Sequence, residues 1–239
     1  MVCGNRHSFD IARSGYVNLL QPQDRRSKQP GDSAKAVAAR RRLHDRGFTA
    51  PLLTGIAQIL AAAPADSILD AGCGEGFYAG NIAKMSGCGA AGIDISTSAM
   101  DAAARRYADC LWIAANADRF IPFMDGAFSK IVSITARMNA AEFRRVLQDG
   151  GRLLVAVPAP EDLIELRGRG RDRVERTVES FAKEFELVER DRVTTAAELD
   201  TEAVDDVLHS IYRPMQAQPA TAMRVTFSLD LLLFRACAS

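Results

Sequence analysis

A glycine-rich turn directly after a short apolar run constrains this 239-residue chain more than any other feature. Residues 68–70 have the character of a buried parallel strand end, and Gly72, Gly74 and Gly76 then turn the chain into a helix. Glycine suits such a turn because it adopts unusual φ angles and lets a ligand approach the backbone closely. A dinucleotide-binding fingerprint would place its third glycine at position 77, where this chain has Phe77. The turn therefore indicates an α/β sheet with a different ligand.

The spacing resembles the D-x-G-x-G-x-G pattern of S-adenosylmethionine-dependent methyltransferases, with Asp70 as its acid. In that pattern the acid pairs with the ammonium group of the methionine moiety, and the attraction strengthens in a partly desolvated cleft. The simpler alternative is a tight turn between strand and helix that binds nothing.

A second acid follows the glycines at the distance expected for a ribose-binding carboxylate. Residues 89–95 resemble the next parallel strand, and Asp94 stands near its carboxyl end. A lone Asp at a strand end is usually a turn or cap residue, but Ser96 is the better cap for the following helix. We therefore expect Asp94 to be free for a ligand and to accept hydrogen bonds from both ribose hydroxyls.

Apolar runs alternate with helical patterns after residue 67, which predicts a doubly wound, mostly parallel sheet with helices on both faces. The seven predicted strands span 67–71, 89–94, 110–114, 129–134, 151–157, 185–194 and 223–235. The predicted helices span 33–46, 51–63, 77–86, 97–107, 140–147 and 202–211. The expected architecture is a Rossmann-like class I methyltransferase domain at 33–239, with an antiparallel last strand. A small N-terminal extension, residues 1–32, precedes it and contains a strand-like segment at 16–20.

Charge cancels over the whole chain, with 30 basic and 30 acidic residues, but it is distributed unevenly. Residues 1–50 carry an excess of positive charge, and five arginines gather at 167–176. These clusters either bind an RNA phosphate backbone or form solvated, salt-bridged helix faces. The five scattered cysteines argue against a disulfide framework and favour a cytoplasmic location. No apolar run is long enough to span a bilayer, so we expect no membrane partner.

Strings near the N-terminus resemble one specific family. They occupy residues 3–10 (CGNRHSFD), 15–20 (GYVNLL), 30–33 (PGDS) and 39–41 (ARR). Together they are similar to the 23S rRNA guanine-N1-methyltransferases, with a likeness that extends to about Leu166. The resemblance implies methylation of a guanine in a hairpin of large-subunit ribosomal RNA, a homodimer, and a link to macrolide resistance in some relatives.

The resemblance also implies cofactor contacts by position. The implied contacts are Gly72, Gly74 and Glu75 in the turn, Phe48 before the second helix, Ala117 and Asp118 beside the adenine, and Asp162 after strand 151–157. The family usually has His where this chain has Asp162. Phe48 could instead be a core aromatic, and Asp118 a surface turn residue.

The general base is expected after the strand at 151–157. Guanine N1 carries a proton at neutral pH, so a base near the acceptor assists methyl transfer. Asp162 and Glu161 are the candidates, although either could instead cap the next helix. The extruded guanine could stack on Tyr212, Arg137 or Trp112, of which Trp112 better suits a core position.

The chain departs from the family at the expected metal site. The family begins with a zinc knuckle of the form Cys-x-x-Cys…Cys-x-x-x-His, and this sequence contains only Cys3 and His7 of that set. Structural zinc takes four ligands, so either the sequence begins after the first half or this branch has lost the metal. The string at 134–137 departs as well. A small-molecule methyltransferase and a non-catalytic RNA-binding relative therefore stay open as alternatives.

Overall fold

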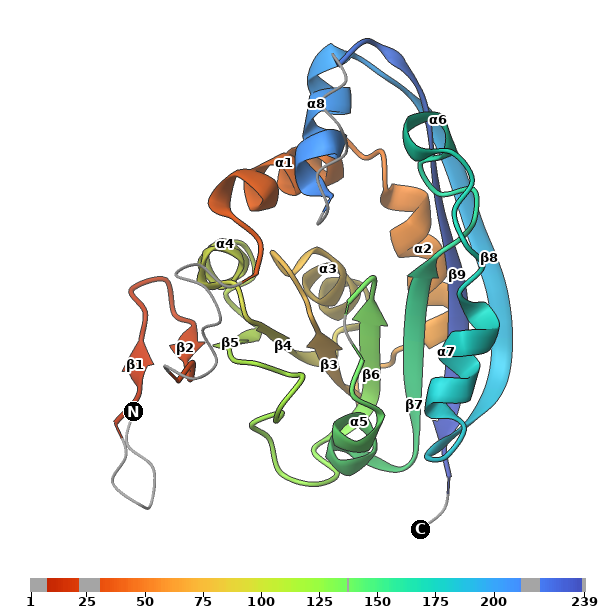
Figure 1. Ribbon diagram of the computed structural model, residues 1–239. Coiled ribbons are helices and arrows are strands. Elements are labelled where there is room, and N and C mark those ends of the chain that lie inside the picture. Colours follow the sequence, from red (N-terminus) through yellow and green to blue (C-terminus); the bar gives the residue numbers. More distant parts are fainter. Residues whose placement is uncertain (1–7, 22–30, 137, 212–219, 238–239) are drawn as a thin grey trace.

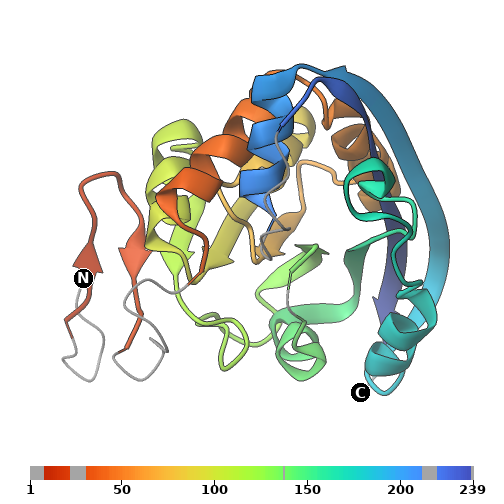
Figure 2. The ribbon, with the colours of Figure 1, turned by 45° about the horizontal axis from the view of Figure 1, so that its top comes forward.

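The computed structural model describes residues 8–21, 31–136, 138–211 and 220–237, which form a sheet with helices on both faces (Figures 1 and 2). The sheet has nine strands in the order β1-β2-β5-β4-β3-β6-β7-β9-β8. The strands are β1 (Asp10–Ile11), β2 (Val17–Asn18), β3 (Ser67–Ala71), β4 (Gly89–Asp94), β5 (Leu111–Ala114), β6 (Phe128–Ile134), β7 (Leu147–Pro158), β8 (Phe185–Leu199) and β9 (Met223–Ala236). The helices are α1 (Ala34–Asp45), α2 (Ala50–Leu60), α3 (Phe77–Ser86), α4 (Thr97–Arg106), α5 (Ala140–Val146), α6 (Ile164–Arg167), α7 (Val174–Phe181) and α8 (Thr201–Ser210).

The class I methyltransferase arrangement predicted from the sequence is confirmed. Strands β3 to β7 run parallel, and β9 lies antiparallel between β7 and β8. The expected count of seven is wrong, because β1 and β2 of the N-terminal extension join the same sheet. Val17 and Asn18 of β2 pair in parallel with β5, so the extension lengthens the sheet at that edge.

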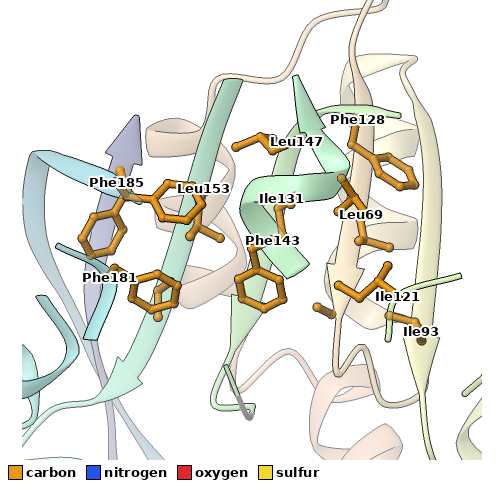
Figure 3. Close-up of a cluster of buried hydrophobic side chains, with 14 of the residues drawn as sticks. Leu69, Ile93, Ile121, Phe128, Ile131, Phe143, Leu147, Leu153, Phe181 and Phe185 are labelled. Atoms are coloured by element: carbon orange, nitrogen blue, oxygen red, sulfur yellow. The ribbon is translucent and has the colours of Figure 1, made fainter. Parts of the chain in front are cut away.

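Consecutive residues of the central strands face two separate apolar clusters, which explains their nearly continuous hydrophobic sequence. In the cluster drawn in Figure 3, Leu69, Ile131 and Leu153 point toward the layer that contains Phe143 and Phe181. Their strand neighbours face the opposite cluster, which is covered by α2, α3 and α8. This two-sided burial fixes the register of the strands, and with it the edge at which their carboxyl ends meet.

The positive charge of α1 is neutralised largely within the fold. Arg42 pairs with the buried Asp206 of α8, with 2.9 Å between Nε and Oδ2. Arg46 pairs with Asp200, the N-cap residue of the same helix, with 2.8 Å between Nη2 and Oδ2. The interpretation of α1 as a salt-bridged helix face is therefore the better one for these arginines.

The indole of Trp112 on β5 packs against glycine backbone in two places. A Cβ atom at Gly76 would lie 2.4 Å from the ring, and one at Gly92 would lie 2.3 Å from it. Trp112 is 2% exposed, and its Nε1 donates to the carbonyl oxygen of Tyr107 at 2.8 Å. Trp112 is therefore a core residue that supports the glycine turn from below, and no face of it is open to stack on RNA.

Two glycines of β4 provide a matched test of this packing. We expect Gly92→Ala to destabilise the protein by about 1–3 kcal/mol, because the added methyl group would overlap the indole. A Cβ at Gly89 meets nothing within 4 Å, so Gly89→Ala should change stability by less than about 0.5 kcal/mol. Urea unfolding followed by the fluorescence of Trp112, the one tryptophan of the chain, measures both variants. Equal stability of the two variants would contradict the packing.

Candidate functional site

The glycine turn adopts the backbone conformation that its sequence predicts. Gly72, Gly74 and Gly76 have φ angles of +83°, +53° and +77°, a region that favours glycine. The Gly72 N–H donates to the carbonyl oxygen of Ile93 at 2.8 Å, which ties the turn to β4. The turn therefore lies across the carboxyl ends of β3 and β4, where open parallel sheets bind their ligands.

Asp70 is the residue before the last one of β3, and its carboxyl group is buried and unsatisfied. Asp70 is 1% exposed, and neither oxygen of its carboxyl group has a hydrogen-bond partner in the described part of the chain. Burial, followed by the charge of Asp94, raises the pKa of Asp70 to about 8. A buried acceptor without a partner costs free energy that a cationic donor would recover. The donor set therefore fits the ammonium group of S-adenosylmethionine.

Asp94 lies at the end of β4 as predicted, but it is not free. Its Oδ2 accepts from the Gly74 N–H at 3.0 Å, and its Oδ1 accepts from the Ser96 N–H at 2.8 Å. Ser96 caps α4 through its hydroxyl, as predicted, which also orients its own N–H toward Asp94. The expectation that Asp94 has no other partner is wrong, because the sharp turn leaves two backbone N–H groups beside it. A carboxylate has acceptor capacity for two further donors, which suits a ribose diol.

Glu75 is held by side chains of α1 that sequence reasoning did not assign to the site. Arg40 Nη1 donates to Glu75 Oε2 at 3.3 Å, and His44 Nε2 lies 3.2 Å from Oε1. Burial alone would raise the pKa of Glu75, but the close contact with His44 and the charge of Arg40 outweigh burial and lower it. Arg40 also pairs with Asp32. The family-like string at residues 39–41 contains Arg40, but the sequence does not indicate that Arg40 pairs with Glu75.

The residues expected to contact the adenine, Ala117 and Asp118, follow β5, whereas the expected aromatic contact, Phe48, precedes α2. Ala117 packs against the core after β5, and the exposed Asp118 donates its backbone N–H to Asn116 Oδ1 at 3.1 Å. Phe48 precedes α2, packs against a buried cluster, and has the guanidinium of Arg46 4.8 Å from its ring centroid. The core alternative for Phe48 therefore describes its observed contacts, and its contact with a cofactor stays a proposal.

Asp162 and Glu161 both anchor the loop that follows β7. Asp162 accepts from the Ser228 N–H at 2.9 Å and from Arg167 Nη2 at 2.6 Å. Glu161 pairs with Arg192 of β8, at 3.1 Å between Oε2 and Nη1. Neither caps a helix, because the N-cap residue of α6 is Leu163 and α6 has no side-chain cap. The cap interpretation is therefore wrong for both acids, whose oxygens instead hold this loop to β8, β9 and α6.

Several predicted residues lie outside the described part of the chain. They are Cys3, His7, Arg137 and Tyr212. Within the described residues, no group of three or more His, Cys, Asp or Glu side chains is arranged to hold a metal ion. Among the described helices, none combines the length and hydropathy that a membrane span requires.

Comparison with known proteins agrees with this site. A family model described as a methyltransferase domain matches residues 68–155, and a zinc-ribbon model described as RlmA, N-terminal, matches residues 1–28. The crystal structure of a TehB-like SAM-dependent methyltransferase from Corynebacterium glutamicum is similar with a TM-score of 0.54 at 20% identity, over 85% of this chain and 98% of that one. At this identity the structural likeness shows the fold alone.

Curated relatives share much more of the sequence. The 23S rRNA (guanine(748)-N(1))-methyltransferase of Streptomyces fradiae is 36% identical over 217 residues, which are 86% of this chain and 76% of the relative. A relative from Micromonospora griseorubida, provisionally named a 23S rRNA (guanine-N(1)-)-methyltransferase, is 34% identical over 77% of this chain and 69% of its own length. With the glycine turn, Asp70 and Asp94 in position, the chain belongs to the S-adenosylmethionine-dependent 23S rRNA guanine-N1-methyltransferase family.

Proposed function

We propose that this enzyme methylates N1 of a guanine in a hairpin of 23S rRNA. The observation that carries the proposal is the 36% identity, over most of the chain, to a relative named for that reaction. The unsatisfied carboxyl group of Asp70 supports the donor half, because a cation at the carboxyl edge of the sheet would stabilise its ionised form. A ribosomal substrate agrees with the cytoplasmic location expected from the cysteines. We extend the proposal to macrolide resistance on the family resemblance.

The side chains of the site have distinct proposed roles. Bound S-adenosylmethionine supplies a methyl group already activated on a sulfonium, so the protein contributes mainly alignment. Asp70 holds the ammonium, Asp94 and the turn hold the ribose, and Ala117 and Asp118 border the adenine. A base role for Asp162 requires Arg167 to release its Oδ2. Burial raises the pKa of Asp162, which moves it toward the range where a carboxylate accepts protons near neutral pH.

We propose that residues 1–32 form an RNA-recognition extension. The match of residues 1–28 to the N-terminal RlmA model supports this role. Cys3 and His7 would supply half of a zinc site there. Because β2 pairs with β5, RNA held by the extension would lie beside the edge of the catalytic sheet.

We propose a second RNA contact at the arginines after α6. Arg171, Arg173 and Arg176 are exposed and form no ion pair in the described residues, in contrast to the arginines of α1. The Gly170 N–H donates to the Pro160 carbonyl oxygen at 2.7 Å, so this loop folds back toward the carboxyl end of β7. The segment therefore begins near the carboxyl end of β7, where we propose that phosphates of a bound hairpin pass.

Affinity for S-adenosylmethionine should depend on the charge of Asp70. The ammonium pairs with the ionised carboxylate, so below a pKa of about 8 binding must first remove a proton. We expect affinity measured by calorimetry to rise by up to about tenfold per pH unit between pH 6 and 8. Asp70→Asn should weaken binding by about two orders of magnitude and remove most of this slope. A wild-type affinity independent of pH, or an unaffected variant, would contradict the role of Asp70.

The unliganded protein should show the opposite pH trend in its stability. The folded pKa of Asp70 lies above its usual value of 3.8, so the folded state binds more protons between these values. The contribution of Asp70 to the free energy of unfolding is therefore greatest below 3.8 and is lost as the pH rises toward 8. The Asp70→Asn variant should lack this contribution when urea unfolding is compared across that range.

The acceptor can be identified by mass mapping of 23S rRNA after incubation with the enzyme and labelled S-adenosylmethionine. We expect one methyl group on N1 of a hairpin guanine with the wild type, and none with Asp94→Ala. Cofactor binding without any methylated RNA would favour the small-molecule alternative. Absence of cofactor binding would favour the non-catalytic one.

The exposed arginines should affect RNA binding through its salt dependence. Replacing Arg171, Arg173 and Arg176 with Gln should reduce the slope of log affinity against log salt by up to about three, because each lost phosphate contact removes roughly one released counterion. The matched control is Arg46→Gln, whose partner is Asp200 and not RNA. Filter binding between 50 mM and 200 mM salt measures both. Equal slopes for the triple variant and the control would reject this contact.

A further inference from the structure

Thr135 adopts a backbone conformation that a β-branched residue rarely takes. Its φ angle is +52°, and the other non-glycine residues with positive φ in the described part of the chain are Ala61 and Leu163. A β-branched residue in this region is strained, because its side chain crowds the neighbouring peptide groups. Such strain persists where the surroundings force it, and it concentrates at functional sites.

Contacts on both sides hold Thr135 in this conformation. Its N–H donates to the Ala156 carbonyl oxygen at 2.8 Å, which ties it to β7. The next residue, Ala136, lies so close to the glycine turn that a Cβ at Gly72 would be 2.4 Å from the Ala136 Cβ. The strained residue is thus fixed between β7 and the turn.

The side chain of Thr135 is available to a substrate. The residue is exposed, and its hydroxyl makes no hydrogen bond in the described residues. It follows β6 directly, and Val132 of β6 pairs with Asp70 of β3. The hydroxyl is therefore an unused donor and acceptor at the carboxyl edge of the sheet, next to the strand that carries the buried acid.

We propose that the Thr135 hydroxyl hydrogen-bonds to the Watson–Crick edge of the guanine that receives the methyl group. The hydroxyl donates a hydrogen bond to guanine O6, which leaves the adjacent N1 facing the methyl group of S-adenosylmethionine. Thr135 takes no proton from N1 and acts as a specificity-determining residue. This role rests on the function proposed above. The left-handed backbone turns the side chain out of the strand pattern, which accounts for the strain at this position.

Two substitutions separate the hydroxyl from the shape of the side chain. Thr135→Val keeps the branched shape, and Thr135→Ser keeps the hydroxyl. We expect T135V to lower kcat/KM for rRNA by about tenfold, the effect of one lost hydrogen bond, and T135S to stay within about threefold of the wild type. Both should retain the wild-type Kd for S-adenosylmethionine and the wild-type urea midpoint. The matched control is Thr195→Val on β8, which should leave every parameter unchanged.

The strain has its own test. Thr135→Gly removes both the strain and the hydroxyl, so it should unfold at a urea concentration no lower than the wild type and lose methylation as T135V does. A lower midpoint for T135G, or full activity of T135V, would overturn the role of Thr135. If the wild type binds S-adenosylmethionine but methylates no guanine N1, the proposed function fails instead. That outcome is recorded with the wild type alone, so the two failures are distinguishable.

Discussion

The close contact between one indole ring and glycine backbone determines how the rest of the site is built. Trp112 occupies the volume that side chains at Gly76 and Gly92 would need, so the turn after β3 can lie directly over β4 and β5. Because the turn lies so close to the sheet, the Gly74 N–H reaches Asp94, and the Gly72 backbone reaches both β4 and the segment after β6. Larger residues would lift the turn and separate these groups. The packing of Trp112 in the core therefore determines the geometry of the ligand-binding turn.

Electrostatics explains why this turn suits a cation. Among the described residues, Asp70, Glu75 and Asp94 border the turn, and the guanidinium of Arg40 contacts Glu75 alone of these three carboxylates. Glu75 is thereby kept ionised, while Asp70 has no partner. The site carries an uncompensated acid in a desolvated position, where the attraction to an ammonium or sulfonium is stronger than in water. A ligand without a hydrogen-bond donor or a positive charge at this point would leave the ionised acid unsatisfied.

Local sequence patterns predicted the central sheet but not its long-range contacts. Strand β4 and helix α3 occupy the predicted residues, because apolar runs and the flanking glycines mark them clearly. Helices α6 and α7 were missed, since they are short and lie in a charged segment without a long apolar period. The pairing of Arg42 with Asp206 joins residues 164 positions apart, so no local pattern contains it. The positive φ of Thr135 is imposed by β7 and the glycine turn, against the preference of the residue itself.

The place of β9 has a consequence for biosynthesis. Among the described strands β9 comes last in chain order, yet it lies between β7 and β8 and pairs with both. Until β9 leaves the ribosome, β8 has no strand to pair with. Helix α8 also emerges before β9, since it lies between β8 and β9 in the chain. A nascent chain that stops before Met223 therefore leaves the backbone groups along one edge of β7 unpaired, and folding of this half must await the synthesis of β9.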